Sequence, residues 1–119
     1  MFRLERLLKS FGYAFKGIGE LIASQANARI HLVAMVVVTI AGYYYRLNAE
    51  EWRSIVFAFA LVLSAEAFNT AIEYLTDLVS PDHHPLAGKV KDIAAGAVLI
   101  CALFAVIIGA TIFLPKIFA

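Results

Sequence analysis

The stretch Ile93-Ala-Ala-Gly-Ala-Val-Leu-Ile-Cys-Ala-Leu-Phe-Ala-Val-Ile-Ile-Gly-Ala-Thr-Ile-Phe-Leu114 runs for 22 residues without a charged side chain. About 20 apolar residues are enough for a helix to cross the hydrocarbon core of a bilayer, so this run predicts a transmembrane helix. Two further apolar runs precede it, and we expect three spans, at residues 30–47, 54–79 and 93–114. The pattern predicts an all-α integral membrane fold in which residues 1–119 form a single domain.

The composition agrees with a membrane protein. Apolar residues make up 62% of the chain and charged residues 16%, with a mean hydropathy of +0.82. An average soluble domain is about 45–50% apolar and about 25% charged, so a disordered chain, a collagen-like fibre and a disulfide scaffold are excluded. The formal net charge of +1 also argues against a nucleic-acid partner, since such modules usually carry a clear basic excess.

Residues 1–24 have the pattern of a helix lying on the membrane surface. Apolar side chains recur at steps of three and four residues, at Leu4, Leu7, Leu8, Phe11, Phe15, Ile18, Leu21 and Ile22. Mostly basic residues fall between them, as expected of an amphipathic helix in the headgroup layer.

Basic residues flank the spans unequally. Seven lie on one side, namely Arg3, Arg6, Lys9, Lys16, Arg29, Lys89 and Lys91, and three lie on the other, namely Arg46, Arg53 and Lys116. Because cytoplasmic loops carry the excess of Lys and Arg, we expect the N-terminus and the loop between the second and third spans to be cytoplasmic.

Polar side chains enter the second span with no glycine or proline to end the helix. Glu66 is followed at intervals of three, four, seven and eleven residues by Asn69, Thr70, Glu73 and Asp77, so all five share one helix face. A carboxylate at the bilayer centre costs roughly 2.5–3.5 kcal/mol even on lenient insertion scales. This face therefore predicts a functional site, and a solvated helix end or a structural polar seam between helices is the plainer alternative.

The loop after this helix adds further candidates. Ser80-Pro-Asp-His-His-Pro85 ends the helix, because proline cannot continue the hydrogen-bond ladder. The spacing of Asp82-His83-His84 fits a zinc site poorly and suits contact with a nucleotide better. Lys91 and Asp92 stand just before the third span, where a lysine beside a helix N-terminus can hold a phosphate. In the plainer alternative, Asp92 caps the third helix and Lys91 anchors it at the headgroups.

These groups suit phosphoryl transfer at a membrane surface. That reaction needs a carboxylate to take a proton from the attacking hydroxyl, acidic ligands for Mg²⁺, and a cation near the phosphates. Glu66 lies deeper and suits the base, whereas Glu73 suits the metal. Their separation of seven residues is roughly 10 Å along the helix axis, a distance that the γ-phosphate of ATP and its Mg²⁺ can bridge.

The motifs also resemble the sequence motifs of a known family. Ala65-Glu-Ala-Phe-Asn-Thr-Ala-Ile-Glu73, Asp77 and Lys91-Asp-Ile-Ala-Ala-Gly-Ala-Val98 closely resemble the prokaryotic diacylglycerol kinase family, which includes the undecaprenol kinases. The resemblance also covers Gly12-Tyr13, Lys16-Gly17 and Asn27-Ala-Arg-Ile-His31. It implies a homotrimer of three-span protomers in the bacterial cytoplasmic membrane, each with a surface helix, that uses Mg²⁺ and ATP to phosphorylate a lipid alcohol. The motif sequences are more similar to those of the undecaprenol kinases than to those of the diacylglycerol branch.

The resemblance also implies roles for individual residues. Glu66 resembles the catalytic base, Asn69 its neighbouring active-site amide, and Glu73 a ligand of the metal and ATP. The positions that match ATP contacts are Arg6, Tyr13, Asp82, His83, His84, Lys91 and Asp92. Gln25 stands where the family usually has a second metal-binding glutamate. Either coordination at that position is weaker, or Glu20 substitutes for it, or the chain is a weak or altered kinase; we favour an active kinase.

A second hypothesis comes from a different class of protein. Intramembrane carboxylates also mark proton and ion pathways, so the chain could be a small transport or ion-coupling protein. A transporter has no need of Lys91 and Asp92 beside a cluster large enough for ATP, and its acids should lie nearer the middle of the span. In a third interpretation, a structural subunit, the acidic face has no catalytic role.

Overall fold

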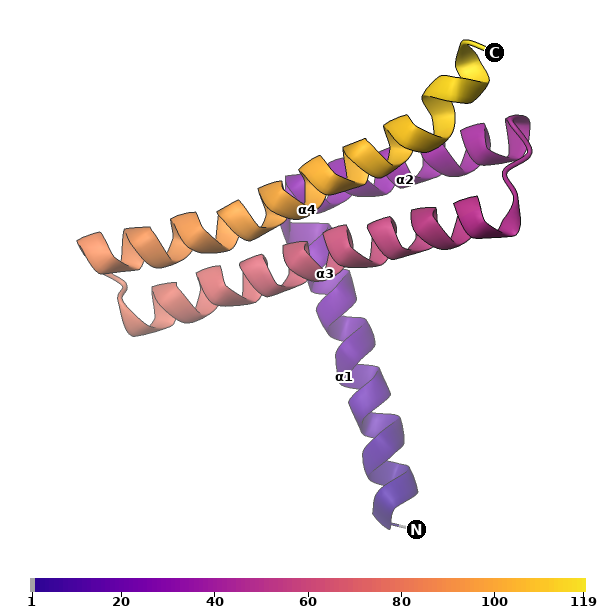
Figure 1. Ribbon diagram of the computed structural model, residues 1–119. Coiled ribbons are helices and arrows are strands. Elements are labelled where there is room, and N and C mark those ends of the chain that lie inside the picture. Colours follow the sequence, from indigo (N-terminus) through magenta and orange to yellow (C-terminus); the bar gives the residue numbers. More distant parts are fainter. Residues whose placement is uncertain (1) are drawn as a thin grey trace.

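Four helices account for nearly all of residues 2–119, which the computed structural model describes. They are α1 (Phe2–Ser24), α2 (Ala26–Tyr44), α3 (Ala49–Val79) and α4 (Pro85–Ile117). The described residues contain no strand. Met1, which the predicted surface helix 1–24 includes, lies outside them. Figure 1 shows α2, α3 and α4 side by side, while α1 leads away from them at a steep angle. The all-helical prediction is confirmed.

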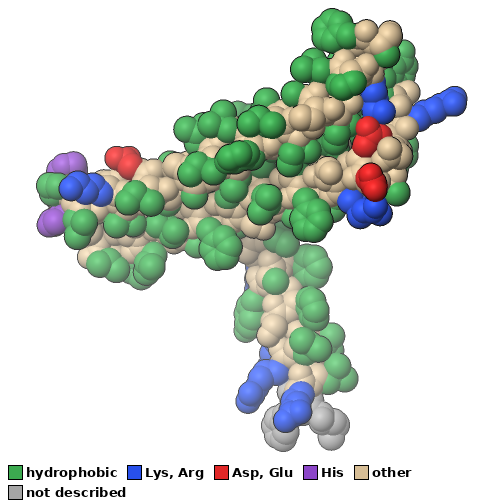
Figure 2. Space-filling model, viewed as in Figure 1, with side chains coloured by type: hydrophobic (Ala, Val, Ile, Leu, Met, Phe, Trp, Pro, Cys, Tyr) green, Lys and Arg blue, Asp and Glu red, His purple; other side chains and the backbone are tan. Residues whose placement is uncertain are grey.

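The three helices α2, α3 and α4 are each long and apolar enough to cross a membrane. Most of their large apolar side chains are exposed. Figure 2 shows apolar side chains over the middle of the bundle and charged side chains gathered toward its two ends. A bundle that is apolar on its outer surface is stable when lipid or other apolar helices cover it, so this surface agrees with three predicted spans.

The connection between α2 and α3 is a tight and well-bonded turn. Glu51 N–H donates to Asn48 Oδ1 at 2.9 Å and Asn48 N–H donates to Glu51 Oε1 at 3.0 Å, which together form a capping box. Leu47 N–H donates to the carbonyl of Gly42 at 3.1 Å. The other carboxylate oxygen of Glu51 lies 3.2 Å from Lys116 Nζ, so the turn is also tied to the end of α4.

A small apolar core lies directly behind this turn. Leu47, Ile55 and Ile112 are buried together. Trp52 packs on Tyr43 with ring centroids 5.1 Å apart. We call this part of the bundle, with the turn and the Glu51 ion pair, the closed end.

The opposite end of the bundle joins α3 to α4. α3 continues without interruption to Val79, and α4 begins at Pro85, where its fixed backbone angle suits the first helical position. His84 caps α4, because its Nδ1 accepts a hydrogen bond from Leu86 N–H at 3.0 Å. We call α3 from Glu66 onward, the connection to α4, and α4 as far as Asp92 the polar end.

Hydrogen bonds from two side chains, Arg29 and Tyr74, join α1 to the bundle near the C-terminus of α1. Arg29 Nη1 donates to the carbonyls of Ile22 and Ala23, each at 2.9 Å, and so satisfies carbonyls that the helix end leaves free. Tyr74 Oη donates to Glu20 Oε1 at 2.9 Å and joins α1 to α3. These contacts hold the last turn of α1 beside the polar face of α3.

Candidate active site

Glu66 is the most deeply buried charged side chain of the described residues. It lies near the middle of α3 and is 1% exposed. His31 of α2 approaches it, with Nε2 3.1 Å from Glu66 Oε1, although the ring is not aligned for a hydrogen bond. A carboxylate removed from water is costly unless it is paired or bonded, so this burial marks a site rather than a solvated helix end.

Three buried polar atoms at this site have no hydrogen-bond partner within residues 2–119. They are Glu66 Oε1, Asn69 Oδ1 and Thr70 Oγ1. Buried polar groups are nearly always satisfied in folded proteins. A run of three unsatisfied groups over about one helical turn therefore indicates that something outside this chain, such as a ligand, supplies the missing partners.

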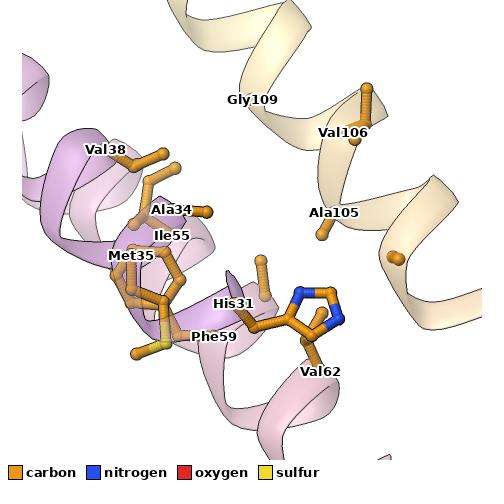
Figure 3. Close-up of a pocket in the computed structure, with 12 residues that line it drawn as sticks. His31, Ala34, Met35, Val38, Ile55, Phe59, Val62, Ala105, Val106 and Gly109 are labelled. Carbon is orange, nitrogen blue, oxygen red and sulfur yellow. The ribbon is translucent and has the colours of Figure 1, made fainter. Parts of the chain in front are cut away.

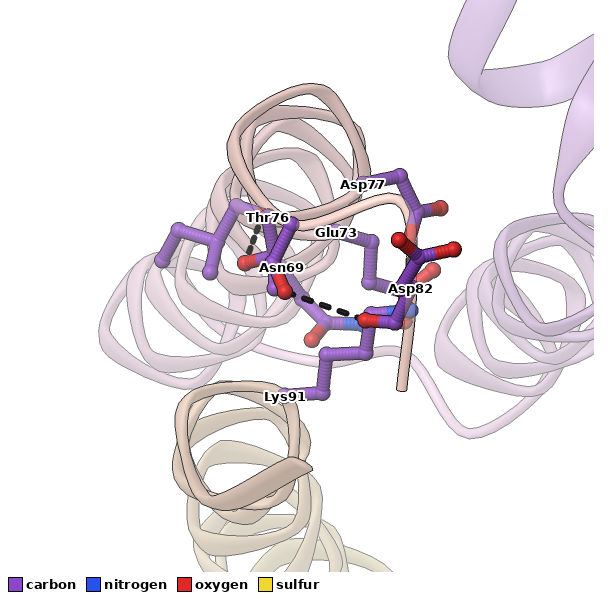
Figure 4. Close-up of polar contacts among 8 residues, drawn as sticks. Asn69, Glu73, Thr76, Asp77, Asp82 and Lys91 are labelled. Carbon is purple, nitrogen blue, oxygen red and sulfur yellow. Dashed lines mark hydrogen bonds and ion pairs between the residues drawn. The ribbon is translucent and has the colours of Figure 1, made fainter. Parts of the chain in front are cut away.

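Asn69 and Glu73 are joined one turn further along α3. Asn69 Nδ2 donates to Glu73 Oε1 at 3.2 Å, which limits the rotation of both side chains. Figure 4 shows Asn69, Glu73 and Asp77 of α3 together with Asp82 and Lys91 at this end of the bundle. The structure thus brings together Asn69, Glu73, Asp77 and Lys91, four of the groups that the sequence singles out.

Lys91 connects α4 to the acidic face of α3. Its Nζ lies 2.6 Å from Asp77 Oδ1. Lys91 precedes the uncharged run that begins at Ile93, and the hydrogen bond to Asp77 raises the pKa of its ammonium group, with a smaller contribution from the charge of Glu73. The cation is therefore fixed next to two carboxylates, where phosphate oxygens bridged by a metal ion could reach it.

The loop residues Asp82, His83 and His84 lie at the same end and are exposed. Ser80 Oγ donates to the carbonyl of Asp82 at 3.1 Å, which shapes the turn. His84 also serves as the cap of α4, so its ring has a structural partner on one nitrogen. Asp92 is exposed on the first turns of α4.

Three predicted site residues are not brought to this cluster within one chain. Arg6 and Tyr13 are exposed on the part of α1 that Figure 1 shows leading away from the bundle. Gln25 lies between α1 and α2, where its Nε2 donates to Ser24 Oγ at 3.4 Å. In residues 2–119 it makes no hydrogen bond with Glu73.

Two contacts were not predicted from the sequence. One is the pair of His31 and Glu66, and the other is the hydrogen bond from Tyr74 to Glu20. The only signal for His31 was its position as a polar residue within an apolar run, and that signal does not identify a partner on another helix. Tyr74 directly follows Glu73 in the sequence, but that position does not identify Glu20 as its hydrogen-bond partner.

No group of three or more His, Cys, Asp or Glu side chains that could hold a metal ion by themselves occurs in the described part of the chain. A magnesium ion bound through one or two carboxylates, with substrate phosphates and water completing its ligands, does not require such a group. Glu73 offers carboxylate oxygens, and Asn69 Oδ1 is a buried oxygen without a partner one turn away. This donor set suits a hard cation shared with a nucleotide.

Comparisons with known proteins agree with this chemistry. The family described as prokaryotic diacylglycerol kinase matches residues 12–113. An undecaprenol kinase of Bacillus subtilis is 43% identical over 95% of this chain and 92% of its own length. A diacylglycerol kinase of Synechocystis is 42% identical over 92% of this chain and 63% of its own length. A diacylglycerol kinase of Escherichia coli is 30% identical over 86% of this chain and 84% of its own length.

Together, the helical membrane fold and these relatives define the class of the protein as a membrane lipid kinase. The chain belongs to the prokaryotic diacylglycerol kinase family. It is a bacterial membrane protein, and the transport and structural-subunit hypotheses give way to that of a kinase.

Proposed function

We propose that this protein transfers the γ-phosphate of ATP to undecaprenol at the cytoplasmic surface of the bacterial membrane. The observation that carries the proposal is the burial of Glu66 with one carboxylate oxygen free of hydrogen bonds, in a chain of a lipid kinase family. The relative that is 43% identical is named an undecaprenol kinase, which favours this acceptor. Diacylglycerol, in the names of the other relatives, is the alternative acceptor.

Glu66 acts as the general base. A lipid hydroxyl that reaches the buried site donates its hydrogen bond to the free lone pairs of Glu66 Oε1 and then its proton. The lipid oxygen forms a bond to the γ-phosphorus as the bond from that phosphorus to the oxygen bridging to the β-phosphate breaks. The net products are a lipid phosphate and ADP, and the proton remains on the carboxyl group until it is passed on.

Glu73 and Lys91 hold the phosphates in this proposal. Glu73, oriented by Asn69, is the protein ligand for Mg²⁺, which when bound neutralises charge on the phosphate oxygens. Lys91, fixed by Asp77, supplies the cation beside the departing phosphates. The exposed loop of Asp82, His83 and His84, together with Asp92, contacts the rest of the nucleotide.

We also propose that the active enzyme is a homotrimer with a cytoplasmic N-terminus. α1 lies on the membrane surface as an amphipathic helix, with its apolar side chains in the headgroup layer. Arg6 and Tyr13 lie on the part of α1 that leads away from the bundle, so in this proposal they complete the nucleotide site of a neighbouring subunit. The exposed apolar surface of the bundle supports assembly with other copies in the membrane.

Gln25 gives a direct test of the metal assignment. A neutral amide attracts Mg²⁺ less than a carboxylate does, so Gln25→Glu is expected to lower the Mg²⁺ concentration for half-maximal activity by about 3-fold to 10-fold. The measurement is a magnesium titration of lipid phosphorylation at saturating ATP. An unchanged titration would mean that another residue, with Glu20 the nearest acidic candidate on α1, completes the site.

The acceptor is tested with purified protein in proteoliposomes that contain either undecaprenol or diacylglycerol. We expect transfer of labelled phosphate from ATP to both alcohols to require Mg²⁺, with kcat/KM higher for undecaprenol by about tenfold or more. A higher kcat/KM for diacylglycerol would overturn the choice of acceptor. No phosphorylation of either lipid would overturn the proposed function.

A further inference from the structure

We propose that His31 is a positioning residue for Glu66, which holds the carboxylate in the orientation that accepts the proton of the lipid hydroxyl. This inference rests on the proposed function, because it requires Glu66 to be the base. His31 belongs to α2, whereas Glu66 and the other polar groups of the site belong to α3, α4 or the connection between them.

The first support is the geometry of the pair. His31 Nε2 lies 3.1 Å from Glu66 Oε1, the same oxygen that has no hydrogen-bond partner. A carboxylate oxygen accepts at more than one lone pair. His31 Nε2 is therefore within reach of this oxygen on one side, and the oxygen can still accept from a hydroxyl that approaches on another.

The second support is the difference in burial between the two side chains. The side chain of Glu66 is 2% exposed and that of His31 is 25% exposed. Glu66 is thus almost fully enclosed within the described chain, whereas a quarter of the His31 side chain is exposed. His31 is the polar group best placed to stabilise the buried carboxylate.

The third support is the environment of the imidazole ring. His31 lines a cavity of about 230 Å³ between α2, α3 and α4. Figure 3 shows the ring projecting from α2 into this cavity, between Val62 of α3 and Ala105 of α4. The other eleven lining residues are uncharged and carry apolar side chains or, at Gly109, none. A polar ring in such a cavity is costly unless it has a partner, and the polar atom within reach of Nε2 is Glu66 Oε1, at 3.1 Å.

Substitutions at this position separate donation from packing. His31→Gln places an amide nitrogen close to the position of Nε2, whereas His31→Leu fills similar space without a donor. Met35 lines the same cavity one turn along α2, so Met35→Leu is the matched control for changes in packing alone.

The experiment measures kcat and KM for lipid phosphorylation in proteoliposomes. We expect His31→Leu to lower kcat by about tenfold or more, with KM for the lipid within about twofold, and His31→Gln to stay within about threefold of the wild type. Met35→Leu should match the wild type. A kcat of His31→Leu within about threefold of the wild type, or no recovery in His31→Gln, would overturn the proposal.

A double-variant cycle tests whether His31 acts through Glu66. In Glu66→Asp the carboxylate is withdrawn from the ring, so adding His31→Leu should lower kcat by less than about threefold further. A full tenfold additional loss would show that His31 acts independently of Glu66 and would overturn the proposal. If Glu66→Gln is as active as the wild type, the proposed function itself fails, which is a different outcome.

A spectroscopic measurement covers the case in which His31→Leu does not fold. The ring nitrogens of His31 should shift in ¹⁵N NMR spectra when Glu66 is replaced by Gln, while those of the exposed His83 and His84 should not. Identical His31 signals in the wild type and in Glu66→Gln would overturn the contact on which the proposal depends.

Discussion

The two ends of the bundle both contain α3 and α4 but differ in how their polar groups are satisfied. At the closed end, Asn48 and Glu51 bond each other's backbone, and the ion pair to Lys116 joins α3 to α4. At the polar end, Glu66 and Asn69 are buried, and each retains an oxygen without a partner within residues 2–119. At the closed end these polar groups find their partners within the chain. At the polar end, buried oxygens need partners from outside residues 2–119.

This difference separates the part that stabilises the fold from the part that carries chemistry. Unsatisfied buried groups lower stability, and proteins retain them where a ligand or a reaction uses them. Substitutions at the polar end should therefore reduce activity with little loss of stability, and substitutions at the closed end should do the reverse.

Three substitutions, Glu73→Gln, Gly42→Ala and Glu51→Gln, test this separation of the two ends. Glu73→Gln, at the polar end, should have the largest effect of the three. Changes to groups that merely support a metal ligand cost about 10-fold to 100-fold, so loss of a direct ligand should lower kcat/KM for MgATP by about 100-fold or more. Steady-state kinetics over a range of Mg²⁺ concentrations measure the effect. Unchanged kinetics would mean that Glu73 does not bind the metal ion. A large drop in melting temperature would mean that Glu73 stabilises the fold instead.

Gly42→Ala should have the next largest effect, at the closed end. A Cβ at Gly42 would lie 2.5 Å from Trp52 Cη2 and 3.1 Å from Leu47 Cδ1, so the packed ring must move. Overpacking of this kind costs about 1–3 kcal/mol. Gly109→Ala is the control, because its Cβ meets no atom within 4 Å and the better helix propensity of alanine should stabilise α4 by up to about 1 kcal/mol.

Unfolding in mixed detergent micelles, followed by the fluorescence of Trp52, measures both glycine variants. We expect kcat of folded Gly42→Ala to equal that of the wild type. If the two variants are equally stable, the closed end is not tightly packed around Gly42.

Glu51→Gln should have the smallest effect. Glutamine can still complete the capping box with Asn48, so only the ion pair to Lys116 is lost. Partly exposed ion pairs contribute at most about 1 kcal/mol, and the melting temperature should fall by a few degrees or less with full kinase activity. A loss of activity in a folded protein would contradict the separation of the two ends.

Much of the fold follows from the sequence because its signals are local. The uncharged run from Ile93 to Leu114 and the lack of glycine or proline between Ile55 and Val79 identify long helices without knowledge of their neighbours. Spacing along one helix likewise places Asn69 beside Glu73, and the structure shows that contact.

Contacts between helices could not be predicted in this way. His31 meets Glu66, and Glu20 meets Tyr74, only because α1, α2 and α3 pack in a particular order and register. Nothing in the identity of either partner indicates the other. The direction of α1 is also a tertiary property, so the distance of Arg6 and Tyr13 from the polar cluster of their own chain was not foreseen.

The most direct test of the central claim compares two glutamates of α3 in one assay. Glu66→Gln and Glu50→Gln remove the same charge from the same helix, the first at the buried site and the second on the exposed first turn. Rates of phosphate transfer from MgATP to undecaprenol are measured for both in proteoliposomes, after melting temperatures show that both are folded. We predict that Glu66→Gln lowers kcat by about 10²-fold to 10⁴-fold, as expected on loss of a general base, and that Glu50→Gln leaves it unchanged. A folded Glu66→Gln enzyme with a rate within about threefold of the wild type would contradict the assignment of Glu66 as the base.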